Sequence, residues 1–196
     1  MLIFKSHMRF FIALEIPEEN LAQFKAIQQS LHTLIPQSII TDLDKIHLTL
    51  AFMGEQPDNL KDKLIEIIKA AVSGVPTFEV TPAYIDGFPS IHNPHVLWVG
   101  VKGDIDKILM IRERIKDGLE SLKLPVDLRR FTPHITIAKL NNDFDVSKAL
   151  EVKLEKMMAM PFEPIRISSI KLFESAPNEG FHEHKTLAEV NLTVVE

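Results

Sequence analysis

Hydrophobic and polar residues follow two different periods along this chain. In residues 9–16 every second position is apolar, which predicts a half-buried strand. In residues 18–35 apolar positions instead recur every three or four residues, which predicts an amphipathic helix. The two-residue period also predicts strands at 47–52, 78–85, 95–101, after Pro133 and twice within 165–195, with a turn at 177–180. The helical period predicts further helices at 57–74, 105–122 and 146–158. The turn-rich segment 86–94 is expected to be a loop.

This order of elements indicates an α+β protein. The strands that begin at His47 and His134 each follow a strand and a helix, so the chain reads as two related halves. We therefore expect two pseudo-symmetric lobes of mainly antiparallel sheet, with helices on the outside and a central cleft. No linker divides the chain, so residues 8–196 are predicted to form a single bilobal domain. Residues 1–7 are interpreted as an N-terminal extension or an upstream start.

Composition narrows the function classes. The 196 residues carry a formal net charge of -5, which argues against a broadly cationic surface for long duplex nucleic acid but leaves room for a local phosphate site. The chain has no cysteine, which excludes disulfides, thiolate nucleophiles and the usual thiolate zinc sites, and favours a cytoplasmic location. No apolar run reaches the roughly 18 residues of a membrane span. We expect a monomer that works without a membrane.

Two short segments place the same polar residues in apolar strands. The letters HLTL begin at His47, and the letters HITI begin at His134. Successive side chains of a strand point to opposite faces, so His47 shares a face with Thr49, and His134 shares a face with Thr136. The apolar residues between them are then buried on the other face. Each strand therefore holds an imidazole and a hydroxyl on a firmly anchored backbone.

A pair of such segments suits acid–base chemistry on a phosphodiester. Imidazole has an ordinary pKa of about 6.5, so it gives or takes a proton near neutral pH. One neutral imidazole can take a proton from an attacking water while a second, protonated imidazole supplies a proton to the departing oxygen. Threonine hydroxyls can donate hydrogen bonds to the phosphate oxygens, where negative charge sits in the transition state.

These motifs resemble those of the 2H phosphoesterase superfamily, which is named for two H-x-T-x motifs. The flanking segments RFFIALEIPEE, GFPSIHNPHVLWVGV, RRFTPHITIAK and IKLFESAPNEG are similar to those of its RNA 2′,3′-cyclic phosphodiesterase branch, once described as 2′-5′ RNA ligases. The resemblance extends from Met8 to about Val195. A single H-x-T is a weak signal, but two in strand context with these flanks are a specific one.

The resemblance implies an enzyme that hydrolyses the 2′,3′-cyclic phosphate at an RNA end, or a small 2′,3′-cyclic nucleotide, to a 2′-phosphate, with reversible 2′-5′ ligation as a related reaction. It implies no cofactor and no metal. By analogy, His47 is the proton donor and His134 the proton acceptor. Thr49 and Thr136 bind the phosphate. Lys139 stands where the family commonly has a phosphate-binding arginine, although strict alternation places it on the face opposite His134.

Other functions stay open from the sequence. The HEH segment at 182–184, with His92 and His95, is compatible with a metal-dependent hydrolase, although it lacks the helical spacing of known zinc motifs. A non-catalytic module that binds RNA ends is a further alternative. Phe52 is predicted to lie in the core, with base stacking as the alternative. The adjacent pair Arg129 and Arg130 is predicted to be solvated rather than catalytic.

Overall fold

The structure is a computed structural model that describes residues 7–127, 129–141, 144–178 and 181–194. At residues 177, 178, 181 and 182 it describes the backbone but not the side chains. Its strands are β1 (His7–Glu15), β2 (Ile39–Ile40), β3 (His47–Pro57), β4 (Phe78–Phe88), β5 (Val96–Gly103), β6 (His134–Lys139), β7 (Ile165–Ile167), β8 (Ser169–Asn178) and β9 (Phe181–Asn191). Its helices are α1 (Glu18–Leu34), α2 (Lys61–Val72), α3 (Ile105–Ser121) and α4 (Lys148–Met157), with 3₁₀ turns at Leu43–Lys45 and Asp58–Leu60.

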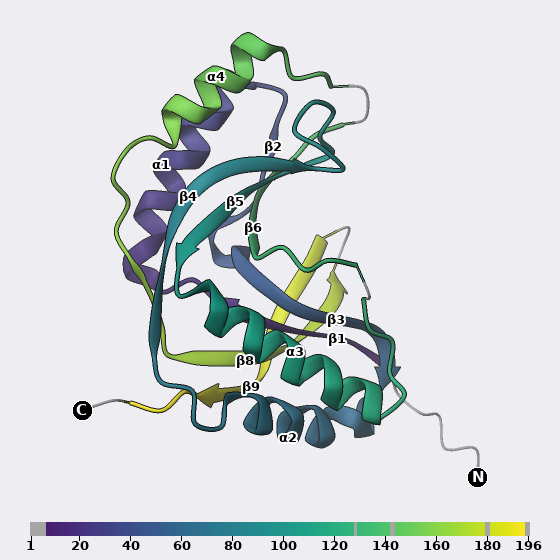
Figure 1. Ribbon diagram of the computed structural model, residues 1–196. Helices are drawn as coiled ribbons and strands as arrows, with labels where there is room; N and C mark the ends of the chain where they lie inside the picture. Colours follow the sequence, from purple (N-terminus) through teal and green to yellow (C-terminus); the bar gives the residue numbers. More distant parts are fainter. Residues whose placement is uncertain (1–6, 128, 142–143, 179–180, 195–196) are drawn as a thin grey trace.

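The described strands form one curled sheet with the order β7-β4-β5-β6-β3-β1-β8-β9, and β2 pairs with β6 (Figure 1). All pairings between these strands are antiparallel. The two histidine strands, β3 and β6, are neighbours at the centre, where they pair at Leu48 and Ile135. Helices α1 and α4 lie against the β4–β6 side, and α2 and α3 lie against the side of β3, β8 and β9. The predicted α+β class and the mainly antiparallel sheet are confirmed.

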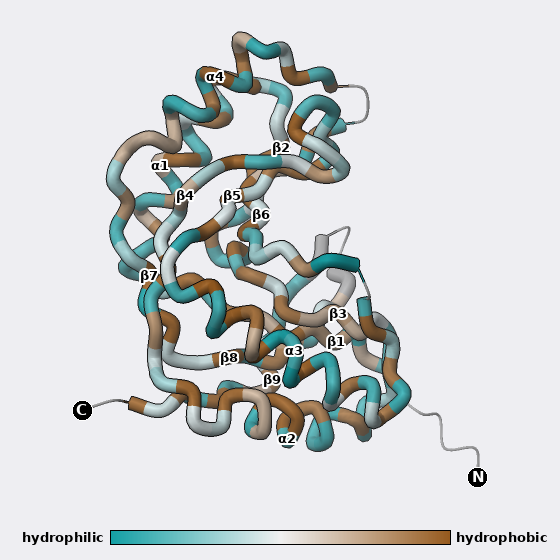
Figure 2. The backbone as a smooth tube through the Cα atoms, viewed as in Figure 1, coloured by the Kyte–Doolittle hydropathy of each residue, from teal (hydrophilic) through white to brown (hydrophobic). Residues whose placement is uncertain are grey.

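The core is built from the apolar faces that the periods predict. Hydrophobic and hydrophilic stretches alternate along α2 and α3 in Figure 2, as expected for helices that cover a sheet. In α1, Phe24 and Leu31 are fully buried, which stabilises the fold by roughly 1.5–3 kcal/mol for each side chain. Glu18 and Glu19 in the first turn of this helix favour its start because they face the positive end of the helix dipole. Gln28 lies inside the same buried stripe and is only 4% exposed.

Two expectations about the elements are wrong. Strand β4 continues to Phe88, because residues 86–88 pair with β5 despite their turn-forming composition. The C-terminal segment contains three strands rather than two, since β7 pairs with β4 at one end of the sheet and β8 pairs with β1 on the other side. Ser168, the single residue between β7 and β8, therefore marks the point where the chain passes from one lobe to the other. Of the predicted turn at 177–180, residues 179 and 180 lie outside the described residues.

The histidine strands share one irregularity that shapes the site. Along β3, Thr49 and Ala51 face consecutive residues of β1, so Leu50 is an extra residue, a β-bulge. Along β6, Thr136 and Ala138 face consecutive residues of β5, so Ile137 is extra in the same way. Each bulge reverses the alternation of the side chains that follow it. Both strands accordingly show one burial pattern in their first six residues, with the second, fourth and fifth side chains buried and the sixth exposed.

Candidate active site

The central strands bring four predicted site residues together. Leu48 pairs with Ile135, so the register places His47 across from Thr136 and Thr49 across from His134. Leu48 and Ile135 are buried on the opposite face. All four polar residues line one cavity of about 540 Å³, together with Lys139. The prediction that the two H-x-T segments face a shared cleft agrees with this placement.

Each catalytic candidate is oriented by its own backbone. Nδ1 of His47 lies 2.7 Å from the carbonyl oxygen of Lys45, and Nδ1 of His134 lies 2.8 Å from the carbonyl oxygen of Thr132. A carbonyl oxygen only accepts hydrogen bonds, so Nδ1 carries the proton and donates in both rings. The other ring nitrogen, Nε2, is then the atom that exchanges a proton with a bound molecule.

Burial sets the protonation of the pair. Burial lowers the pKa of His47 below its ordinary value, and the positive charge of His134 lowers it further, while the hydrogen bond to the Lys45 carbonyl and the Glu15 carboxylate oppose the shift. Burial also lowers the pKa of His134, against its hydrogen bond to the Thr132 carbonyl. Because a charge on one ring disfavours a charge on the other, the state in which both rings are positively charged is disfavoured.

Aromatic side chains hold both imidazoles in place. The ring of His47 lies 5.1 Å from the Phe11 ring and 5.3 Å from the His184 ring, measured between centroids. The ring of His134 meets the edges of Phe88 at 4.9 Å and Trp98 at 5.6 Å. Phe11 and Trp98 come from β1 and β5, the strands that flank the two histidine strands. Each imidazole therefore packs against aromatic rings from its own side of the sheet, so the two imidazoles are held in a similar way.

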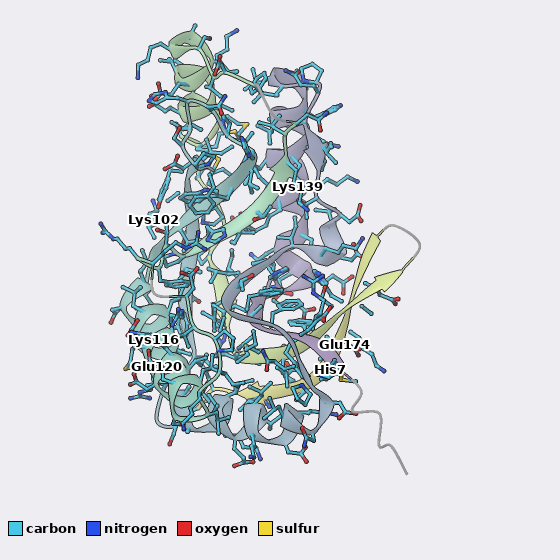
Figure 3. The ribbon with its side chains drawn as sticks, turned by 90° about the vertical axis from the view of Figure 1, so that its right-hand side faces the viewer. His7, Lys102, Lys116, Glu120, Lys139 and Glu174 are labelled. Carbon is cyan, nitrogen blue, oxygen red and sulfur yellow. The ribbon has the colours of Figure 1, made fainter. Side chains whose placement is uncertain are left out.

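Lys139 reaches the cleft because of the bulge at Ile137. Strict alternation predicts the opposite face, and that expectation is wrong: the extra residue returns Lys139 to the side of Thr136. Figure 3 shows Lys139 where β6 ends. The carbonyl oxygen of Ile137 accepts hydrogen bonds from the Thr41 amide and from Nε2 of the buried Gln28, both at 3.0 Å. Gln28 also donates to the Thr41 carbonyl at 2.7 Å, so this side chain fastens the bulge to the strand beside it.

The bulge at Leu50 also corrects the prediction for Phe52. Phe52 was expected in the core, but it is 53% exposed, because the extra residue turns it outward in the way that the second bulge turns Lys139. It lines a second cavity of about 440 Å³, which shares Thr49 and His134 with the first. Arg129 and Arg130 line this second cavity as well. The sequence did not assign these side chains to the site.

The HEH segment lies in β9, and His184 from this segment lines the first cavity. The side chain of His182 lies outside the described residues. His92 and His95 lie between β4 and β5. Across the described residues, no three His, Cys, Asp or Glu side chains lie close enough to hold a metal ion. No helix in the described part of the chain has the length and apolar character that crossing a membrane requires.

The sequence model of the 2′-5′ RNA ligase superfamily matches residues 41–179, a segment that contains both histidine strands. This match covers more than half of the chain. The chain belongs to the 2′-5′ RNA ligase superfamily. The resemblance inferred from the H-x-T motifs is thereby confirmed.

Two proteins similar to this chain are named RNA 2′,3′-cyclic phosphodiesterase. The one from Aeropyrum pernix is 28% identical over 159 residues, which cover 81% of this chain and 88% of the relative. The one from Thermotoga maritima is 28% identical over 162 residues, which cover 82% of each chain. The crystal structure of the Thermus thermophilus protein TT0787 has the same fold, with a TM-score of 0.75, 20% identity and coverage of 94% of this chain and 98% of its own. The superfamily fold thus extends over almost the whole chain.

Proposed function

We propose that this protein hydrolyses the 2′,3′-cyclic phosphate at RNA ends, or in small 2′,3′-cyclic nucleotides, to a 2′-phosphate by acid–base catalysis between two histidines and without a metal ion. The observation that carries this proposal is the pairing of His47 and His134 across one cavity, each ring fixed through Nδ1. Membership of the 2′-5′ RNA ligase superfamily and the names of the two relatives support the substrate class.

In the proposed reaction, Nε2 of neutral His134 takes a proton from water as the water oxygen attacks the phosphorus. The bond between phosphorus and the ribose 3′ oxygen breaks, and Nε2 of protonated His47 gives its proton to that oxygen. One proton enters the pair and one leaves it, so the pair keeps a single positive charge, which passes from His47 to His134. Glu15, which pairs with Lys171 and lies across from His47 in the sheet, favours the charged form of His47 and supports its role as the acid.

Three further side chains of the first cavity stabilise the phosphate in this proposal. The hydroxyls of Thr49 and Thr136 donate to the non-bridging oxygens, and Lys139 supplies positive charge. Lys45 also lines this cavity, but its ammonium group pairs with Asp42 at 2.6 Å, so much of its charge is already balanced. The same geometry serves the ligation reaction when a 5′-hydroxyl group takes the place of water, which gives a 2′-5′ linkage.

The test is incubation of the purified protein with a 2′,3′-cyclic nucleotide in excess EDTA, followed by identification of the product by phosphorus NMR. We expect ring opening to the 2′-phosphate at an unchanged rate. Activity that is lost in EDTA and restored by zinc supports a metal-dependent hydrolase instead. Tight binding without any ring opening supports a non-catalytic module for RNA ends. A cytoplasmic location and a monomeric state stay predictions from the sequence.

A further inference from the structure

The second cavity lies beside the proposed catalytic centre and differs from it in chemistry. Its wall includes Thr49 and His134, which belong to both cavities, so a molecule bound in one cavity directly adjoins a molecule bound in the other. The remaining wall comes from the end of α3, the segment before β6, and the aromatic residues Phe52 and Phe88. The proposed reaction uses only the shared residues of this cavity, which leaves the rest of its wall without a role.

A buried arginine in this wall has donor groups that no protein acceptor satisfies. Arg112 on α3 is only 5% exposed, and its Nη2 donates to the carbonyl oxygen of Asp127 at 3.1 Å. Its Nε and Nη1 atoms are buried and lack hydrogen-bond partners among the described residues. Buried guanidinium nitrogens without an acceptor are unfavourable, so Nε and Nη1 are suited to a ligand that brings anionic oxygens. Phosphate is such a ligand.

The charges around Arg112 also favour an anion. The carboxylate of Asp127 accepts hydrogen bonds from Arg129, with Nη2 to Oδ2 at 2.6 Å, so the Arg129 charge is balanced. Arg130 lines the cavity, is exposed, and has no ion-pair partner among the described residues. The charge of Arg130 is therefore available to a bound group. Arg112 is partly stabilised by the Asp127 carboxylate and by the Phe131 ring, whose centre lies 5.5 Å from its guanidinium carbon, but two of its donor atoms remain available.

Phe52 adds a surface for a nucleobase. Its ring is half exposed at the edge of the cavity, at the position in β3 that corresponds to Lys139 in β6. The guanidinium of Arg9 lies 5.7 Å from the centre of this ring and supports it from β1. Aromatic rings next to cations are the usual platform for single-stranded nucleic acid, in which bases are free to stack.

We propose that the second cavity binds the nucleotide that precedes the cyclic end of a single-stranded RNA, with its phosphodiester group on Arg112 and Arg130 and its base against Phe52. This inference rests on the proposed function, because it assumes that the cyclic phosphate occupies the first cavity. It makes the preferred substrate a strand of at least two nucleotides, rather than a free cyclic mononucleotide.

The test compares three substrates of the full-length protein: a cyclic mononucleotide, a dinucleotide with a 2′,3′-cyclic end, and the same dinucleotide with a neutral methylphosphonate linkage. We expect kcat/KM for the charged dinucleotide to exceed that for the neutral one by about tenfold or more, because charge-assisted hydrogen bonds to the linkage are lost. In Arg112→Met and Arg130→Ala this ratio is expected to fall close to one. Phe52→Leu is expected to lower kcat/KM for both dinucleotides. Phe52→Trp is expected to keep kcat/KM close to that of the parent protein.

The matched control is Lys153→Ala, which removes one positive charge from the exposed surface of α4 and should leave the ratio unchanged. Arg130→Ala carries the test by itself if Arg112→Met does not fold, since Arg130 is exposed. Equal kcat/KM for both linkages in the parent protein overturns the inference while the proposed function stands.

Binding of the dinucleoside monophosphate ApA and of its methylphosphonate, measured by calorimetry, separates the two hypotheses. Without turnover of any substrate, the proposed function fails, but preferential binding of charged ApA that depends on Arg112 and Arg130 still supports the subsite. If free AMP or inorganic phosphate binds through these arginines while the linkage charge has no effect, the cavity takes a separate phosphate, and the RNA-strand inference is wrong.

Discussion

The two histidine strands are built alike and diverge at their sixth residue. Both begin with histidine, place threonine two residues later, and contain an extra fourth residue that forms a bulge. The sixth residue is Phe52 in β3 and Lys139 in β6, and each lies at a different cavity. The same kind of β-bulge therefore places an aromatic ring on one side of the two imidazoles and a cation on the other. Under the proposed function, these two side chains contact different parts of one RNA end.

The surroundings of the two imidazoles also differ. His47 has a carboxylate nearby, Glu15, which favours its charged form, whereas among the described residues no carboxylate shifts the pKa of His134. His47 also contacts a third imidazole, His184, while the His134 ring is enclosed by Phe88 and Trp98. The carboxylate of Glu15 supports the proposed role of His47 as the acid.

Replacement of the imidazoles should have the largest effect. His47→Ala and His134→Ala are each expected to lower kcat by about 10²- to 10⁴-fold, because each removes one proton transfer. The double variant should lose little more than the single ones, since both groups act in one step. Circular dichroism provides the folding control. Near-full turnover in both folded variants contradicts the assignment.

The difference between Phe52 and Lys139 predicts the next effect. Lys139→Met is expected to lower kcat/KM by about ten- to a hundredfold through loss of charge-assisted hydrogen bonds to the phosphate, and Lys139→Arg should retain activity. Lys102→Ala, on the exposed end of β5, is the matched control with the same loss of charge. If both alanine and methionine replacements of Lys139 leave kcat/KM unchanged, the bulge has no part in phosphate binding.

A smaller effect is expected from the side chain that fastens the second bulge. Gln28→Leu removes two buried hydrogen bonds and should lower the free energy of unfolding by about 1–3 kcal/mol, as seen in urea titration. It should also raise KM, because Lys139 loses its fixed position. Gln23→Leu is the control: this half-buried side chain on the same helix exchanges two hydrogen bonds with the Glu163 backbone at the protein surface, and their loss should change stability less than the loss of those of Gln28. A stability loss in Gln28→Leu with unaltered KM would show that the bulge holds without this clamp.

The sequence predicted the motif but not its irregularity. His47, Thr49, His134 and Thr136 were predictable because strand alternation decides which side chains share a face. The bulges were not, since an extra residue is defined only by the partner strand. One local signal exists: in HLTLAF and HITIAK two apolar residues in succession interrupt the alternation.

Two buried polar residues carried a similar signal. Gln28 falls within the apolar stripe of α1, between Phe24 and Leu31, and Arg112 falls within the stripe of α3, between Ile108 and Ile115. A polar side chain inside an apolar helix stripe must find a partner after burial. The partner of Gln28 is 109 residues away in sequence, at Ile137. Only the tertiary structure brings these two segments together.

The smallest predicted effect is a loss of folding stability as pH falls. Both histidines have folded pKa values below the ordinary value, so the unfolded chain binds protons first. The neutral rings therefore contribute stability above about pH 6.5, and this stability is lost as pH falls through the folded pKa values. In His47→Ala, thermal unfolding measured from about pH 8 to about pH 5 should show a weaker decline of Tm than in the parent protein. His32→Ala provides the comparison, because the imidazole of His32 lies on α1, outside both cavities. An equal decline in the parent and in His47→Ala would mean that burial at the cleft does not couple folding to protonation.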